Sequence, residues 1–119
     1  MARIRTIKPQ FFLNEQLADL PFEARLAFIG LWNQSDREGR LEDRPKRLKA
    51  EIFPYDNVDM DKILEKLSHH NDPFITRYEY EGKRFIQINN FKKHQYPHIK
   101  EPDSTIPAPC KNSSKPVKA

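Results

Sequence analysis

The stretch PFITRYEYEGKRFIQIN, residues 73–89, decides the fold class of this chain. Residues 74–80 alternate with a period of two, which is typical of a β-strand. Glu81–Gly82 then forms a two-residue turn with glycine where a positive φ is wanted, and residues 85–89 return as a second strand. The stretch therefore predicts a β-hairpin. On its first strand, one face carries Phe74, Thr76, Tyr78 and Tyr80 and the other carries Ile75, Arg77 and Glu79.

Upstream of the hairpin, the sequence predicts a long helix that begins at Pro21, because proline suits the first helical position. It ends near Ser35 or Asp36, ahead of Gly39. Its apolar stripe is wide enough that we expect a mostly buried helix with Trp32 in the core. The stripe consists of Phe22, Leu26, Ile29 and Trp32, widened by Ala24, Phe28 and Leu31.

Shorter elements lie on either side of this helix. Asn14 heads one short turn of helix, and residues 40–42 make one short strand. A second helix opens at Pro45 and ends before Pro54, since proline excludes the helical conformation for the residue before it. A third begins after an Asp56–Asn57 cap. The apolar faces of these two helices are Leu48 and Ile52 in the second, and Met60, Ile63, Leu64 and Leu67 in the third.

The order of elements is helix, short strand, helix, helix and hairpin. This order is that of a winged helix-turn-helix, an α+β fold in which the hairpin turn projects as the wing. We expect residues 1–102 to form this domain, with a basic N-terminal arm anchored by Ile4, Ile7, Phe11 and Phe12. Residues 103–119 are polar and proline-rich, so we expect a disordered tail or the start of a linker.

Composition sets limits on the function. The chain has 119 residues and a net charge of +4, which permits a polyanionic partner. Its single cysteine, Cys110, excludes an internal disulfide framework. The longest apolar run, LAFIGLW at residues 26–32, is too short to span a bilayer, and the first twelve residues lack the apolar stretch of a signal peptide. We therefore expect a cytoplasmic protein with no membrane association.

Clustered bases are the candidate DNA contacts, although the bases near Pro45 also fit a solvated helix face paired with Glu42 and Asp43. They lie in the arm, at the start of the second helix, beside the predicted turn, and after the hairpin, where Phe91 and Tyr96 add stacking surface. The candidate DNA-binding residues are Arg3, Arg5, Lys8, Arg44, Lys46, Arg47, Lys49, Lys62, Lys66, Lys83, Arg84, Lys92, Lys93, His94, His98 and Lys100.

The third helix favours backbone contact over base reading. Its bases, Lys62 and Lys66, are outnumbered by acids, which suits a groove lined with phosphates poorly. We therefore expect replacement of Lys92 and Lys93 to lower DNA affinity more than replacement of Lys62 and Lys66. The acids are Asp56, Asp59, Asp61 and Glu65.

No residue pattern indicates catalysis, a metal or another cofactor. His94 and His98 are separated by Pro97, which opposes a shared helix face, and no further ligands complete a zinc set. His69 and His70 close the third helix, where cations suit the helix dipole. The three glycines form no phosphate-binding loop, and no histidine lies near Ser35. We expect a protein without enzymatic activity.

Three phrases resemble a known family: ARIRTIKPQFF at residues 2–12, EARLAFIGLWNQSDREGRLEDRPKRLKAEIFPYD at 23–56, and YEYEGKRFIQINNFKKHQYPHIKEP at 78–102. Together they are similar to the N-terminal winged-helix domain of phage and prophage replication proteins, the replisome-organiser or DnaD-type group. The resemblance implies a module of replication initiation that binds DNA or self-associates and helps to bring a helicase or its loader to an origin. It implies contact surfaces on the third helix, on the Glu81–Gly82 wing and on residues 91–100.

Larger members of that family carry a second helical domain after a linker, and residues 103–119 would be only the start of that linker. Loader recruitment is therefore a weaker implication than DNA binding. Two alternatives stay open. One is a protein-interaction or self-association module, an accessory or host-interfering factor, which the acidic third helix favours. The other is a winged-helix transcriptional regulator, which would need an operator preference.

Overall fold

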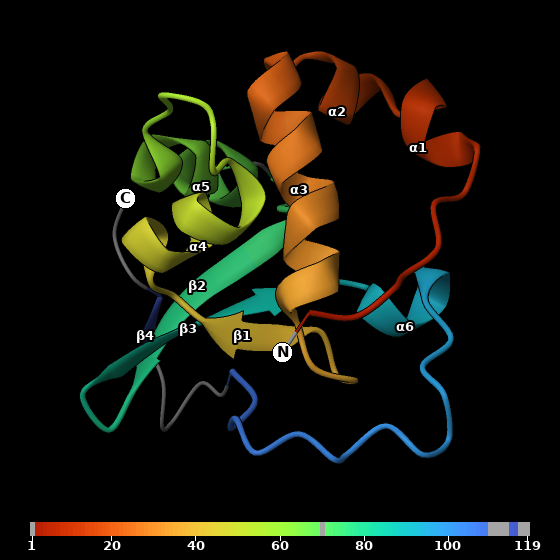
Figure 1. Ribbon diagram of the computed structural model, residues 1–119, viewed down its shortest axis with the longest axis vertical. Coiled ribbons are helices and arrows are strands. Elements are labelled where there is room, and N and C mark those ends of the chain that lie inside the picture. The colour runs from red at the N-terminus through yellow and green to blue at the C-terminus, as the bar shows by residue number, and fades with distance from the viewer. Residues whose placement is uncertain (1, 70, 110–114, 117–119) are drawn as a thin grey trace.

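Helices and an antiparallel sheet share the chain in the computed structural model, which describes residues 2–69, 71–109 and 115–116 (Figure 1). The α+β class is confirmed. The described helices are α1 (Gln10–Leu13), α2 (Glu15–Ala18), α3 (Phe22–Gln34), α4 (Pro45–Ile52), α5 (Met60–Ser68) and α6 (Phe91–His94). The described strands are β1 (Arg40–Glu42), β2 (Ile75–Tyr80), β3 (Lys83–Ile88) and β4 (Lys115–Pro116).

The sheet has the strand order β1-β3-β2-β4, with all neighbours antiparallel. Pairing of β2 with β3 confirms the predicted hairpin, with Tyr78 opposite Phe85. Its turn has φ 50° at Glu81 and 79° at Gly82. Two successive positive φ angles match the right-handed twist of the strands, so glycine in the second position lowers the strain of the turn.

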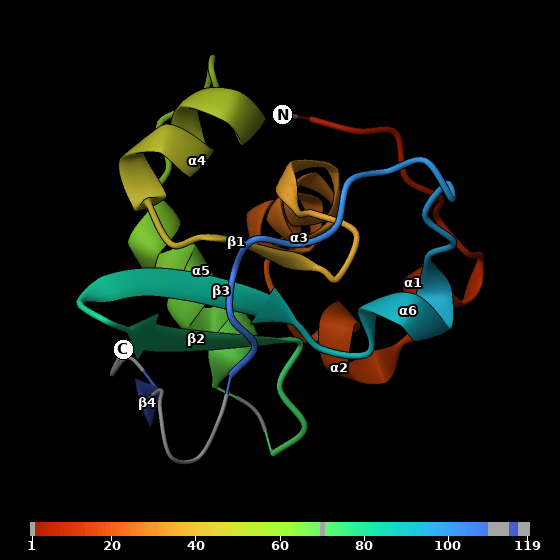
Figure 2. The same cartoon turned by 90° about the horizontal axis from the view of Figure 1, so that it is seen from below.

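Helices α3, α4 and α5 lie on one side of the sheet, and residues 101–109 cross the other side (Figures 1 and 2). The predicted apolar stripe of α5 is confirmed, because Met60, Ile63, Leu64 and Leu67 are all buried. The predicted core position of Trp32 is also confirmed, since its side chain is only 8% exposed. The core therefore lies between α3, α5 and the inner face of the hairpin.

The predicted orientation of α3 is wrong at its N-terminal end. Phe22 and Leu26 are 81% and 54% exposed, whereas the buried face consists of Ala24, Ala27, Phe28, Leu31 and Trp32. Small alanines on the buried face allow close packing of α3 against its neighbours, and the larger Phe22 and Leu26 face outward. The stripe was ambiguous because apolar residues occupy most positions around this helix.

The arm packs against the domain, but not through the residues that we expected. Ile4, Ile7 and Phe12 are exposed, and only Phe11 of the predicted anchors packs on the core. The buried anchor is Arg5, whose side chain is 5% exposed. Polar contacts from Arg5 to backbone carbonyls and a carboxylate hold the arm in place. The spacing of apolar residues in the sequence does not reveal such contacts.

Several local details differ from the prediction. The cap of α5 is Asp59, whose carboxylate accepts a hydrogen bond from the Lys62 backbone N–H, and not the Asp56–Asn57 pair. Helices α1 and α6 were not predicted, because four residues are too few to show a period. Asn14 does cap a short helix, α2, as expected.

The described part of segment 103–119 lies against the domain. The Ser104 hydroxyl donates to the Asp36 carboxylate, and the Pro107 carbonyl accepts a hydrogen bond of 2.7 Å from the Tyr78 hydroxyl. Burial raises the pKa of Tyr78 to about 12. Residues 103–109 form no helix or strand. Cys110, and the rest of the predicted tail apart from β4, lie outside the described residues, as does His70.

Candidate nucleic-acid interface

Five of the predicted basic residues gather where α4 begins and the hairpin passes beside it. The Asp43 backbone N–H donates to the Arg84 carbonyl at 2.9 Å, so the entry to α4 lies directly against β3. Pro45 occupies the first turn of α4, as predicted. We call this group the α4–hairpin surface; it consists of Arg44, Lys46, Arg47, Lys49 and Arg84. Lys83 is exposed on β3 opposite Tyr80, and its side chain points to the other face of the strand from Arg84.

Most of these bases are available to a ligand. Arg44, Lys46 and Arg47 are exposed and make no ion pair within the described residues. Lys49 donates only a long hydrogen bond of 3.4 Å to the Phe53 carbonyl. Arg84 lies 3.8 Å from the Asp43 carboxylate, which a closer guanidinium already binds. The surface therefore presents positive charge next to the exposed start of a helix, where phosphates bind well.

Two acids line the same open depression as the α4 bases, and both are engaged internally. Asp59 caps α5, and Asp61 accepts a hydrogen bond of 2.7 Å from Arg77. These contacts reduce the repulsion that the sequence of the third helix suggested. Lys62 and Lys66 are exposed on α5, away from its buried stripe, and form no ion pair within the described chain.

Arg77 fixes the geometry of this surface from inside the protein. Its guanidinium donates to both carboxylate oxygens of Asp43, at 2.7 and 3.0 Å, and to Asp61. Burial alone would lower the pKa of Arg77, but the hydrogen bonds to the two carboxylates outweigh burial and raise it. One side chain of β2 thereby joins the start of α4 to the first turn of α5. Sequence reasoning missed this group, since nothing local links residues 34 positions apart.

A second basic group lies around the arm and α6. The Lys8 ammonium donates to the Lys93 carbonyl at 3.0 Å and lies over the Tyr96 ring. Lys92 is paired with Glu38 at 2.8 Å, which lowers the pKa of Glu38, chiefly through that hydrogen bond. We call this group the arm–α6 surface; it consists of Lys8, Lys92, Lys93, His94, His98 and Lys100.

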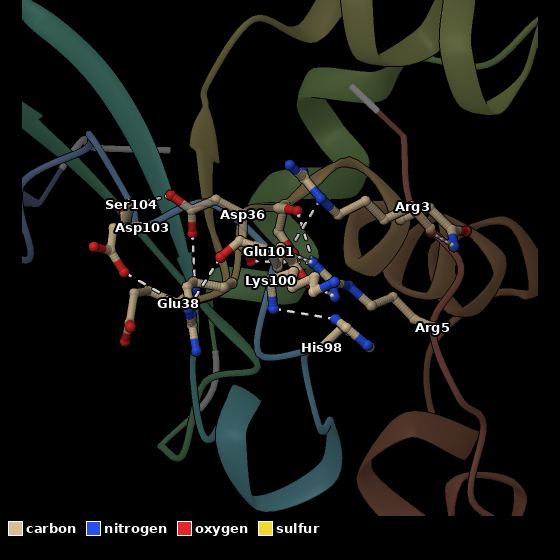
Figure 3. A network of polar contacts seen from close by, with 12 residues as sticks. Arg3, Arg5, Asp36, Glu38, His98, Lys100, Glu101, Asp103 and Ser104 are labelled. Carbon is tan, nitrogen blue, oxygen red and sulfur yellow. Dashed lines mark hydrogen bonds and ion pairs between the residues drawn. The ribbon is translucent and has the colours of Figure 1, made fainter.

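Two arginines of the arm have a structural role (Figure 3). The Arg5 guanidinium binds both oxygens of Glu101, at 3.0 and 2.8 Å, and also donates to the carbonyls of Trp32, Ser35 and Asp36. Arg3 pairs with the same carboxylate at 3.2 Å. We call this group the Glu101 clamp. The donors of Arg5 point into the protein, so Arg5 belongs to neither of the two basic surfaces.

The two surfaces lie at opposite ends of the molecule. Figures 1 and 2 both place α4 and the hairpin turn on one side and α6 on the other. The bases thus form two separate patches instead of one stripe.

Among the described residues, no three or more histidines and acids form a group that could hold a metal ion. Helix α6 ends at His94, so His94 and His98 share no helix face. Among these residues no helix has the length and apolar character to cross a membrane. Comparison of the chain with protein-family models, curated proteins and solved structures finds no match.

Proposed function

We propose that this protein is a winged-helix DNA-binding module without enzymatic activity, of the kind found in replication-initiation proteins of phages and prophages. The order α3, β1, α4, α5, β2, β3 and the sheet order β1-β3-β2 support the winged-helix assignment. The assignment to replication, and a helicase or helicase loader as partner, rest on the resemblance of the sequence phrases alone.

The α4–hairpin surface is the DNA contact that we propose. The observation that carries this proposal is that Arg44, Lys46 and Arg47 are exposed, form no ion pair within the described chain, and lie at the start of α4, which Arg84 of β3 approaches. Such bases neutralise phosphates without reading bases, so binding falls steeply with salt and depends little on sequence.

A titration of a labelled duplex at two salt concentrations tests the proposal. We expect Lys46→Ala/Arg47→Ala to weaken binding at low salt and to reduce the slope of log K against log salt by about two units, roughly 0.9 for each lost phosphate contact. The matched control is Lys62→Ala/Lys66→Ala, which removes two exposed bases from the neighbouring helix. Equal affinity of the wild type and Lys46→Ala/Arg47→Ala would disprove the assigned surface, and absence of binding at low salt would disprove the function.

A second candidate function is self-association or protein binding. Phe22 and Leu26, one helical turn apart, present an exposed apolar strip on α3. Contiguous exposed apolar surface is a common mark of protein contacts. Sedimentation of wild type and Phe22→Ser/Leu26→Ser, each without DNA, separates the two functions. A dimer that persists in high salt and is lost in the variant favours this second candidate.

A further inference from the structure

A cavity of about 660 Å³ lies apart from the α4–hairpin surface, enclosed by the arm, α1, α2, α3, residues 72–74 and α6. Its volume lies within the range of about 300–1,000 Å³ that is common for small-molecule sites. Segments from both ends of the domain enclose it, since residues 6–17 form one side and residues 88–95 form another. We call it the arm pocket.

Aromatic rings form the walls of the arm pocket. Phe11 meets Trp32 edge to face at a centroid distance of 5.4 Å, and Phe28 lies 5.3 Å from Trp32 and 5.4 Å from Phe74. Phe11 and Phe74 both line the pocket and are partly exposed. Walls of this kind favour a flat ring over a branched aliphatic group, because aromatic faces and edges stack on one another.

The rim of the pocket carries polar side chains that form no hydrogen bond or ion pair with the described part of the protein. Within the described part of the chain, five lining side chains take part in no hydrogen bond or ion pair, in contrast to Gln95 and Thr6, which bind one another. Amide side chains offer both donors and acceptors, which suits the edge of a heterocycle. The five are Gln10, Gln16, Asp72, Asn90 and His94.

One cation lines the pocket among the described residues. The Lys8 ammonium gives one hydrogen bond, to the Lys93 carbonyl, and an ammonium has three donors. Burial and the nearby Lys8 and Lys93 lower the pKa of His94, which favours its neutral form. An anionic group of a ligand therefore has one partner here, Lys8.

We propose that the arm pocket binds a single nucleotide, with the base against Phe11 and Phe74, the base edge on the rim amides, and the phosphate on Lys8. A free mononucleotide and an unpaired nucleotide at a DNA end share this chemistry. Only the second source rests on the proposed DNA-binding function. The pocket would then hold one extruded or terminal nucleotide, whereas the α4–hairpin surface contacts the duplex backbone.

Trp32 provides a direct readout, because it is the chain's only tryptophan and it lines the pocket. Tryptophan fluorescence is measured during titration with deoxyadenosine monophosphate, deoxyadenosine and phenyl phosphate. We expect a saturable change in fluorescence with the nucleotide. The affinities for the other two compounds should be lower by about tenfold or more, since deoxyadenosine lacks the phosphate and phenyl phosphate lacks the base edge. A 5′-phosphorylated single strand and a duplex with base-paired ends then distinguish the two sources. Competition by the single strand but not by the duplex indicates an unpaired nucleotide at a DNA end, and competition by neither indicates a free mononucleotide.

Lys8→Met keeps most of the aliphatic stem of the side chain and removes its charge. We expect it to weaken nucleotide binding about tenfold and to leave deoxyadenosine binding unchanged. The matched control is Lys46→Ala, which we expect to weaken duplex binding and leave the nucleotide titration unchanged. Unchanged thermal melting of both variants shows that the fold is intact.

Three outcomes would overturn the proposal: no saturable change in Trp32 fluorescence at millimolar nucleotide, equal affinity for phenyl phosphate and the nucleotide, or unaltered nucleotide binding in Lys8→Met. If Lys8→Met melts at a lower temperature than the wild type, Gln16→Ala serves in its place. Gln16 lines the rim of the pocket and is exposed, so its replacement should weaken nucleotide binding and leave the fold intact. Failure of duplex binding with intact nucleotide binding would overturn the proposed function and leave the arm pocket standing.

Discussion

The guanidinium of Arg77 is buried where β2, α4 and α5 meet. Arg77→Met would leave the Asp43 carboxylate, which is fully buried, without its hydrogen-bonded partner and with only Arg84 at 3.8 Å. Removal of one member of a buried ion pair costs about 3–5 kcal/mol, so we expect a loss of that size in urea unfolding. Arg77→Met/Asp43→Leu should recover much of it, since an apolar replacement of both members is often neutral.

Asp61 provides the comparison for this prediction. Its side chain is 49% exposed, and in Asp61→Asn the buried Arg77 guanidinium keeps both of its hydrogen bonds to Asp43. We therefore expect Asp61→Asn to cost about 1 kcal/mol or less. If Arg77→Met were as mild as Asp61→Asn, the buried pair would have no structural role.

Trp32 forms the centre of an aromatic group with Phe11 and Phe28. Truncation of a buried tryptophan to alanine typically costs about 3–5 kcal/mol, and we expect Trp32→Ala to lower thermal stability accordingly. The check is thermal unfolding monitored by circular dichroism, with DNA binding measured on the folded fraction. An unchanged melting temperature together with weakened DNA binding would contradict the core role of this side chain.

Glu101 makes stability depend on acidity. Its pKa lies below the ordinary value of 4.5, mainly because the carboxylate accepts hydrogen bonds from Arg5. A carboxylate with a lower pKa in the folded state contributes stability that is fully present above its unfolded pKa and is lost as pH falls through the folded pKa. Glu101→Gln should therefore melt earlier at pH 7 and lose less stability than wild type below about pH 4.5.

Melting curves between pH 3 and 7 check this prediction. Asp103→Asn is the control, because Asp103 is almost fully exposed and its ion pair with Arg37 is long, at 3.6 Å. The control should follow the wild-type curve. Parallel plots of melting temperature against pH for Glu101→Gln and wild type would show that the Glu101 clamp does not cause the loss of stability at low pH.

The turn between α3 and β1 shows how one element depends on another that is distant in sequence. Gly39 has φ 77°, and a Cβ there would lie 2.6 Å from the Cβ and Cγ of Phe91 in α6. Gly39→Ala should therefore cost about 1–2 kcal/mol for the backbone and a further 1–3 kcal/mol for overpacking against a buried ring. Chemical denaturation gives the value.

Gly82 separates these two contributions. It has φ 79° and no atom within 4 Å of an added Cβ, so Gly82→Ala carries only the backbone cost, about 1–2 kcal/mol. Equal losses for the two variants would mean that α6 moves away from the turn at no cost. A larger loss for Gly39→Ala would show that α6 is firmly packed.

The elements themselves were predictable where polar and apolar residues separate cleanly. On α5 the acids and lysines leave one apolar face, and on residues 75–88 alternation and Gly82 specify a hairpin. The face of α3 was not predictable, because Phe22 and Leu26 compete with Ala24, Ala27 and Leu31, and size complementarity to α4 and α5 decides between them. The Arg77 pairs, the Glu101 clamp and the arm pocket join residues distant in sequence, which periodicity does not report.

At the scale of the molecule, the separation of the two basic surfaces changes the expected order of the DNA-binding variants. Lys92 is paired with Glu38 and lies at the opposite end from α4. We therefore expect Lys92→Ala/Lys93→Ala to weaken binding of a short duplex less than Lys46→Ala/Arg47→Ala and more than Lys62→Ala/Lys66→Ala. Because the sites are far apart, the effects of the first two pairs on the free energy of binding should add.

Fluorescence anisotropy with a duplex of about ten base pairs, close to 34 Å long, measures this order. The combined fourfold variant tests additivity. A loss in Lys92→Ala/Lys93→Ala that equals or exceeds that of the α4 pair would transfer the main contact to the arm–α6 surface.

The Glu101 clamp also determines when the domain can be completed as the chain is made. Arg3 and Arg5 leave the ribosome before Glu101, which lies 96 residues after Arg5. Synthesis proceeds at about 5–20 residues per second, so the arm waits for several seconds before this carboxylate has been made. During that interval α3, α4 and α5 can already associate, and the arm takes its place only once Glu101 has been added.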